Sequence, residues 1–540
     1  MAVFYRVKTA EEEIRLSEIR RPSYCDLLFV LMLMASSAIA QSAGSQDQLA
    51  GREVPTVVMT TRLVVLDVVV TDQSGKIVSD LKQQDFTVVE DNEPQQIRSF
   101  EAPAQHLIAD SVRIESTAEL AKAPEAPLTI LVLDELNTGF EDMAFARHSL
   151  EKYLKSQPPV LPQPTALLVA GNAKLGVLQD YTRDRQAILA ALVKHIPDLP
   201  NRLIQSGKSG PGAAERLAMS LGSLEEIAQA TVGHPGRKNV IWIGRGFPAV
   251  NTRESTDKEA AVIQNAVEHA INALRDARIT LSMIDPTINA IDTVEIATPD
   301  DLDAAEDNNG SDPFEGNVNF KLLAPATGGK VYFSRNDVDA EIASCARDGN
   351  QYYTLSYSPT NRSDLAQPYR RIHVKIDRPG VTAATRNGYY IQAAQTAAPV
   401  VGGNAEQLRN KIAFDLGSAV NSNISYTGLA ATVAQSHDGK GNFVISVDSH
   451  DLTWRAIAGG NFQSEVTVAV ASFDGRKMLA HTVRELTAYS GLLQPKDASP
   501  STTGFTIPAS IPAAATRVRF VVRDAASGKM GSVDFDPASR

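Results

Sequence analysis

Residues 128–138 read LTILVLDELNT, in which six apolar or β-branched residues are followed by acidic, amide and hydroxyl side chains. An uninterrupted run of this kind is typical of a parallel strand that is covered on both faces. Ligands of open parallel sheets bind beyond the carboxyl ends of the strands. We therefore expect a binding site at Asp134, Glu135, Asn137 and Thr138, where this strand ends.

The sequence on the C-terminal side of this strand alternates between helical and strand patterns. Residues 140–154 have apolar side chains at helical spacing, and further helices are expected at 183–193, 213–230 and 258–277. Short apolar runs at 165–170, 239–243 and 279–284 indicate more buried strands. Repeated alternation over this length predicts an α/β domain at residues 126–348, with a doubly wound parallel sheet and helices on both faces.

Both segments that flank this domain have β patterns. Residues 61–105 and 349–391 each contain short strands separated by turn clusters such as Asp91-Asn92-Glu93-Pro94. Each segment is too short to bury a core by itself. We expect them to form one β-sandwich into which the α/β domain is inserted. Residues 392–404 are a linker by composition, and alternating valines after it predict a second, C-terminal β-sandwich at 405–540.

The first 60 residues indicate export. Two arginines, an apolar run from Leu27 to Met34 and an Ala-Ile-Ala site at 38–40 have the order of a secretory signal peptide, residues 1–40. A polar, flexible leader follows at 41–60. The apolar run is shorter than the roughly 20 residues that span a bilayer, so we expect no stable membrane span after cleavage; an uncleaved anchor is the alternative. The predicted location is periplasmic or secreted.

Composition excludes several classes of function. The net charge is −11, and no lysine or arginine run is long enough for a basic nucleic-acid surface, so no nucleic-acid partner is expected. The nine histidines are scattered, without a His-Glu-x-x-His motif, and no Gly-x-Ser-x-Gly follows a strand. We expect a protein that is not an enzyme and that requires no cofactor. An extracytoplasmic hydrolase is the rival interpretation.

Five motifs, in this order, resemble the von Willebrand factor type A domain, and more closely a VWFA-related subfamily of exported bacterial proteins of acidobacterial type. They are VVTDQSGKIVSDLKQQDFTVVEDNEPQQI (69–97), LDELNT (133–138), GRKNVIWIGRGFP (236–248), ALRDARITLSMID (273–285) and YRRIHVKIDRPGVTAATRNGYY (369–390). The resemblance implies a Rossmann-like sheet whose upper edge can hold a metal-ion-dependent adhesion site.

That family site uses an Asp-x-Ser-x-Ser motif, a threonine from a second loop and an aspartate from a third. By resemblance, Asp134, Thr138 and Thr182 are the candidate ligands for Mg²⁺ or Ca²⁺. However, Leu136 replaces the first serine and Arg245 stands where the aspartate is expected, so the site is degenerate. Glu135 or Asn137 could supply an oxygen ligand in place of the missing ones. The alternative without metal is an ion pair between Asp134 and Arg245.

Together these features predict a non-enzymatic protein for protein binding or adhesion. Its partner is expected to be a protein or an extracellular-matrix ligand, recognised through this upper edge. A metal-dependent form of the same surface is the alternative. The predicted partner-binding residues are Asp134, Glu135, Asn137, Thr138, Thr182 and Arg245.

Overall fold

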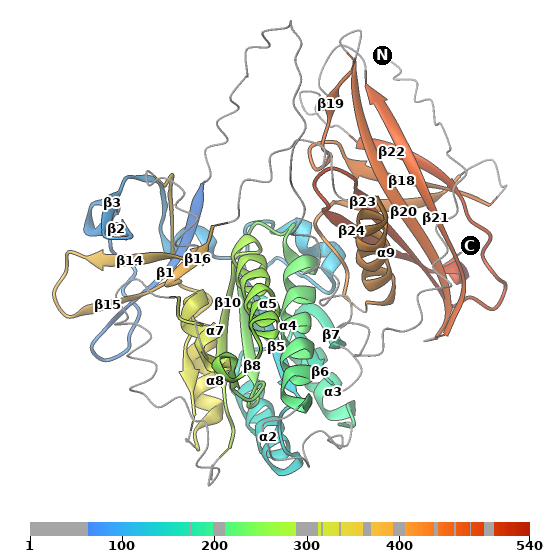
Figure 1. Cartoon of the computed structure of the whole chain (residues 1–540). Helices are drawn as coiled ribbons and strands as arrows, with labels where there is room; N and C mark the ends of the chain where they lie inside the picture. The colour runs from blue at the N-terminus through green and yellow to red at the C-terminus, as the bar shows by residue number, and fades with distance from the viewer. Residues whose placement is uncertain are drawn as a thin grey trace, which may run out of the picture.

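The computed structural model describes residues 63–171, 175–197, 211–287, 312–314, 317–333, 336–359, 369–391, 405–422, 424–436, 441–457, 461–475, 477–490 and 502–539. The predicted signal peptide (1–40), leader (41–60) and linker (392–404) lie outside these residues. Figure 1 shows three units side by side: a β unit, a central α/β unit and a second β unit at the C-terminal end of the chain.

The central unit is built on a six-stranded sheet of order β12-β10-β8-β5-β6-β7. Four of its strand pairs are parallel, and β6 pairs with β7 in the antiparallel direction. The mixed direction corrects the expectation of a wholly parallel sheet. In sheet order the strands are β12 (Val331–Tyr332), β10 (Ile279–Ile284), β8 (Lys238–Ile243), β5 (Leu128–Asp134), β6 (Val160–Ala170) and β7 (Leu175–Asp184).

Helices cover both faces of this sheet. One face packs against α4 (Pro211–Thr231), α5 (Asp257–Asp276) and α7 (Phe320–Thr327). The other packs against α2 (Phe140–Ser156), α3 (Arg185–Lys194) and α8 (Val338–Asp348). Alternate residues of β5 enter the two cores, with Ile130 and Val132 on the first side and Leu131 and Leu133 on the second. This explains why the strand is apolar without alternation.

The segments before and after the α/β unit pair with each other. One four-stranded sheet has the order β15-β1-β13-β4 and the other the order β16-β14-β2-β3, so each contains strands from both segments. Leu66 lies opposite Leu355 and Val88 opposite Val374, and their side chains share one core. The strands are β1 (Val64–Asp72), β2 (Phe86–Glu90), β3 (Glu93–Gln95), β4 (Ile97–Glu101), β13 (Tyr353–Tyr357), β14 (Tyr369–Ile376), β15 (Val381–Ala384) and β16 (Gly388–Tyr390).

The C-terminal unit begins with a helix, α9 (Ala405–Asn421), which corrects the assignment of 405–540 to β structure throughout. Two sheets follow, of order β17-β18-β22 and β19-β20-β23-β24, with β21 paired to β20, and a common core lies between them. Their strands are β17 (Ala431–Gln435), β18 (Asn442–Asp448), β19 (Arg455–Ala456), β20 (Phe462–Asp474), β21 (Lys477–Ser490), β22 (Thr502–Pro508), β23 (Arg517–Asp524) and β24 (Met530–Phe535).

The C-terminal unit is in close contact with α4. The Thr427 amide and hydroxyl both donate to the Ala230 carbonyl, over 2.9 and 2.8 Å. Ser422 donates to Glu226 over 2.6 Å, and buried side chains of α9 and β20 join the core that contains α4. The two units therefore share one hydrophobic core.

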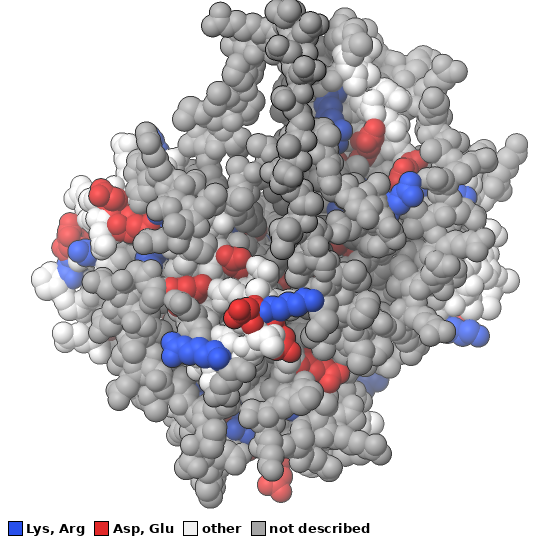
Figure 2. Space-filling view, in the orientation of Figure 1, with Lys and Arg blue, Asp and Glu red and all other residues white. Residues whose placement is uncertain are grey.

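On the face in Figure 2, described Lys and Arg side chains lie between Asp and Glu side chains and form no continuous surface of one sign. Among the described residues, no helix combines the length and the apolar character that are needed to cross a membrane.

Candidate functional site

The Asp134 carboxylate at the end of β5 is completely buried and accepts hydrogen bonds from three residues. Oδ1 accepts from the Asn137 amide at 3.0 Å and from Asn137 Nδ2 at 3.1 Å. Oδ2 accepts from Trp242 Nε1 at 3.0 Å and from the Gly246 amide at 2.9 Å. Burial raises the pKa of Asp134, and the bonds from Trp242, Asn137 and Gly246 oppose that shift.

Asp134 and Thr138 hold the loop that follows β8. The Arg245 amide donates to Thr138 Oγ1 at 3.1 Å, beside the Gly246 bond to Asp134. Gly244 and Gly246 have φ values of 152° and 68°, which favour glycine. A Cβ on Gly244 would lie 2.4 Å from Asp134 Cβ. The loop is therefore packed directly on the end of β5, and Arg245 is exposed at its tip.

Asn137 connects this edge to α4. Its Nδ2 group donates to Ser220 Oγ at 3.1 Å as well as to Asp134. The structure therefore brings Asp134, Asn137, Thr138 and Arg245 together at the carboxyl edge, as the strand-end rule predicts.

Thr182 is not at this edge. It lies on β7, opposite Thr165 of β6, and Thr165 is in turn opposite Thr129 near the start of β5. Asp134 lies five positions after Thr129 along β5, so the two levels are roughly 17 Å apart at about 3.3 Å per residue. The placement of Thr182 in the site is wrong because β7 runs back toward the opposite edge of the sheet.

The alternative of an ion pair between Asp134 and Arg245 is also wrong. Among the described residues, no ion pair joins them, and the donors to Asp134 are amides and an indole. The Arg245 charge acts instead on Asp142, whose pKa is raised by burial and by Asp285 and lowered by Arg245. Burial lowers the pKa of Lys321, while Asp285 opposes the shift and Arg245 adds to it. Arg245 thus belongs to a mixed-charge rim.

These residues do not fit a divalent ion. Both Asp134 oxygens already accept hydrogen bonds, Thr138 Oγ1 accepts from a backbone amide, and Thr182 is at the other edge. An ion would have to displace the Trp242 and Gly246 donors from the buried carboxylate. In addition, the described residues contain no group of three or more His, Cys, Asp or Glu side chains arranged to hold a metal.

Glu135 directly follows β5 but contacts different residues from Asp134. Its Oε1 atom is 2.7 Å from His195 Nε2, just beyond α3, and its side chain is buried. It lines a cavity of about 220 Å³ together with Thr138, Phe140, Met143, Ala144, Arg147 and Pro197. This cavity adjoins the loop of Arg245 through Thr138.

Sequence reasoning missed three residues of the edge. Trp242 was not among the predicted site residues, yet its N–H group donates to Asp134. Asp285 follows β10 directly, so the rule that selected Asp134 would also have found it. Asp142 lies in the first turn of α2, where acidic side chains are favoured.

No protein-family model and no curated protein matches this chain. Among solved structures, proximal thread matrix protein 1 from the mussel byssus is 10% identical over 29% of this chain and 37% of that chain, with a TM-score of 0.20. The SpRpn10 VWA domain is 18% identical over 30% of this chain and 90% of that chain, with a TM-score of 0.17. The human COPII-coat protein Sec24c is 7% identical over 76% of this chain and 43% of that chain, with a TM-score of 0.21. The likeness is weak, although the neighbours include a VWA domain.

Proposed function

We propose that the chain is an exported, non-enzymatic protein that binds a protein or extracellular-matrix partner through the carboxyl edge of its central sheet. Exposed apolar side chains in the segments around the cavity carry this proposal. Among the described residues, six large apolar side chains are exposed, and three of them, Phe140, Val193 and Ile196, belong to the segments around the cavity. Apolar side chains that stay exposed around a cavity are expected at an interaction site.

The exposed Arg245 is part of the same surface. Thr138 lines the cavity beneath Phe140 and also accepts from the Arg245 amide. Arginine and aromatic residues are enriched among the side chains that dominate binding energy at protein interfaces. We define the carboxyl-edge surface as Phe140, Val193, Ile196 and Arg245.

The rival hydrolase lacks support at this edge. Thr138 supplies the only hydroxyl among the residues that line the cavity, and its oxygen accepts from the Arg245 amide. The half-buried His195 ring contacts Glu135. A nucleophile would need a base within hydrogen-bond reach, and no described contact joins Thr138 to His195. Turnover in a broad hydrolase screen would favour the rival.

Photocrosslinking tests the proposal. Benzoylphenylalanine replaces Phe140 in one sample and Phe414, which is exposed at 49% on α9, in a matched control. The proteins are irradiated in the exported fraction of native cells. We expect one adduct from position 140 that Arg245→Glu suppresses, and no equivalent adduct from position 414. Equal adducts from both positions, or none from position 140, would contradict the proposal.

A further inference from the structure

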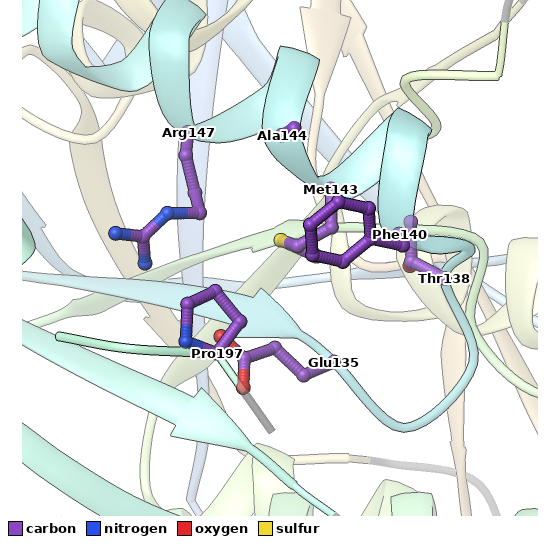
Figure 3. Close-up of a pocket in the computed structure, with 7 residues that line it drawn as sticks. All are labelled: Glu135, Thr138, Phe140, Met143, Ala144, Arg147 and Pro197. Atoms are coloured by element: carbon purple, nitrogen blue, oxygen red, sulfur yellow. The ribbon is translucent and has the colours of Figure 1, made fainter. Parts of the chain in front are cut away.

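The cavity beside Glu135 has an almost wholly apolar wall and a polar base. Phe140, Met143, Ala144 and Pro197 supply the apolar side chains. Figure 3 shows the Arg147 guanidinium and the Glu135 carboxyl on opposite sides of the Pro197 ring, with Phe140 and Met143 beside them. The residues come from the end of β5, from α2 and from the segment after α3.

Arg147 has a donor that no described group accepts. Its Nη2 atom donates to the carbonyls of Leu192 at 2.8 Å and His195 at 2.9 Å. Its Nη1 atom is buried without a partner. A buried unsatisfied donor is unfavourable, so a ligand that brings an acceptor oxygen gains more here than it would at an exposed arginine.

The charges favour a neutral ligand. Burial lowers the pKa of Arg147, and the Glu135 carboxylate opposes that shift. One cation and one anion therefore face the same space. An additional carboxylate would be attracted by Arg147 and repelled by Glu135, whereas a carbonyl oxygen can accept from Nη1 without a second negative charge.

We propose that the cavity binds one large, uncharged apolar residue of the partner chain, of the size of phenylalanine or leucine, whose backbone carbonyl accepts from Arg147 Nη1. This inference rests on the proposed function, because it names the anchor residue of the partner at the same edge. The exposed side chains of Val193 and Ile196 extend the apolar contact beyond the cavity.

The volume sets the size of the anchor. A cavity of roughly 150 Å³ is sufficient for benzene, and sites for drug-sized ligands begin at roughly 300 Å³. The observed volume of about 220 Å³ lies between these values. It therefore suits one side chain with its adjoining peptide group.

The probe is N-acetylphenylalanine amide, with N-acetylphenylalanine as its charged counterpart, and binding to the full chain is measured by ligand-observed NMR. We expect the amide to bind and the charged probe to bind more weakly. Ala144→Trp places an indole from an exposed, lining position over the cavity and should abolish binding. His148→Trp, one turn further along α2 and also exposed, should not.

Arg147→Lys tests the polar contact. This substitution should lower the affinity for N-acetylphenylalanine amide by about tenfold, which is the loss expected for one hydrogen bond to a charged group. Circular dichroism and thermal unfolding verify that each variant is folded. The inference is overturned if wild type does not bind the amide, if Ala144→Trp binds it normally, or if Arg147→Lys leaves its affinity unchanged.

Failure of this inference differs from failure of the proposed function. If the cavity alone is wrong, Ala144→Trp leaves the crosslinked adduct from position 140 intact, while Arg245→Glu still removes it. If the proposed function is wrong, position 140 yields no specific adduct, whether or not N-acetylphenylalanine amide binds.

Discussion

Trp242 donates its indole N–H to the Asp134 carboxylate over 3.0 Å, and both side chains are fully buried. The Asp134 carboxylate is therefore an internal acceptor that joins the end of β5 to β8 and to the loop after it. The exposed group that this loop presents is the Arg245 guanidinium.

Asp134→Ala should destabilise the protein. It leaves the Trp242 and Gly246 donors buried without an acceptor, so we expect a loss of about 2–5 kcal/mol in the free energy of unfolding. Urea denaturation measures it. The control is Glu141→Ala, at an exposed position in the first turn of α2, which should change stability by no more than about 1 kcal/mol. Equal stability of the two variants would contradict the anchoring role.

Gly246→Ala should disturb the Arg245 loop. The position has a φ of 68°, and a Cβ would lie 2.3 Å from Phe320 Cγ. We expect a loss of more than about 1 kcal/mol and a weaker crosslink at the carboxyl-edge surface. Gly504→Ala is the control, because its Cβ would make only an ordinary contact, 3.5 Å from Val444. If Gly246→Ala has wild-type stability and crosslinks normally, the loop can accommodate a side chain at this position and the prediction is wrong.

Protonation of His106 should contribute to acid sensitivity. Burial lowers its pKa to about 4, whereas the unfolded chain titrates near 6.5. Between these values the unfolded state binds the proton more readily, so the free energy of unfolding falls as the pH decreases from about 6.5 to about 4. The ring stacks on Tyr352 with centroids 4.3 Å apart, so His106→Phe preserves a stacked ring.

Over this range the variant should lose up to about 3 kcal/mol less stability than wild type. Some loss remains in the variant, because burial also lowers the pKa of His234 to about 4 and that histidine is still present. Urea midpoints measured from pH 7 to pH 4 give the difference. His148→Phe, at an exposed position, should follow wild type. Parallel profiles for wild type and His106→Phe would exclude a role for His106.

Gly233→Ala should separate the C-terminal unit from α4. A Cβ at this position would lie 1.5 Å from the Thr427 carbonyl oxygen. We expect thermal unfolding to divide into two transitions and α9 to become accessible to protease. Gly222→Ala, within α4 and with open space around it, should instead stabilise by about 0.5–1 kcal/mol. A single transition at the wild-type temperature for Gly233→Ala would contradict tight docking.

Long apolar runs made the central sheet predictable. β5, β8 and β10 are buried along their whole lengths, so their residues could be assigned without knowledge of neighbours. β7 is different: Gly176 to Asp180 are only partly buried at the edge of the sheet, and Thr182 was expected in a loop rather than in a strand. Its reversed direction moved Thr182 away from the predicted site.

The C-terminal helix was missed although it carries a signal. Ile412, Leu416 and Val420 have helical spacing, but the valine alternation further along led to a β assignment for the whole segment. The contacts of α9 with β20 and α4 depend on residues far apart in sequence, which periodicity does not reveal. For the same reason the Trp242 bond to Asp134 could not be predicted, because it depends on strand register.

Calorimetric titration of Mg²⁺ and Ca²⁺ into EDTA-treated protein measures most directly whether the Asp134 carboxylate is available to an ion. We predict no binding heat for either ion in wild type or in folded Asp134→Ala, and partner crosslinking at position 140 that EDTA does not change. Saturable heat in wild type that disappears in Asp134→Ala would contradict the metal-independent surface.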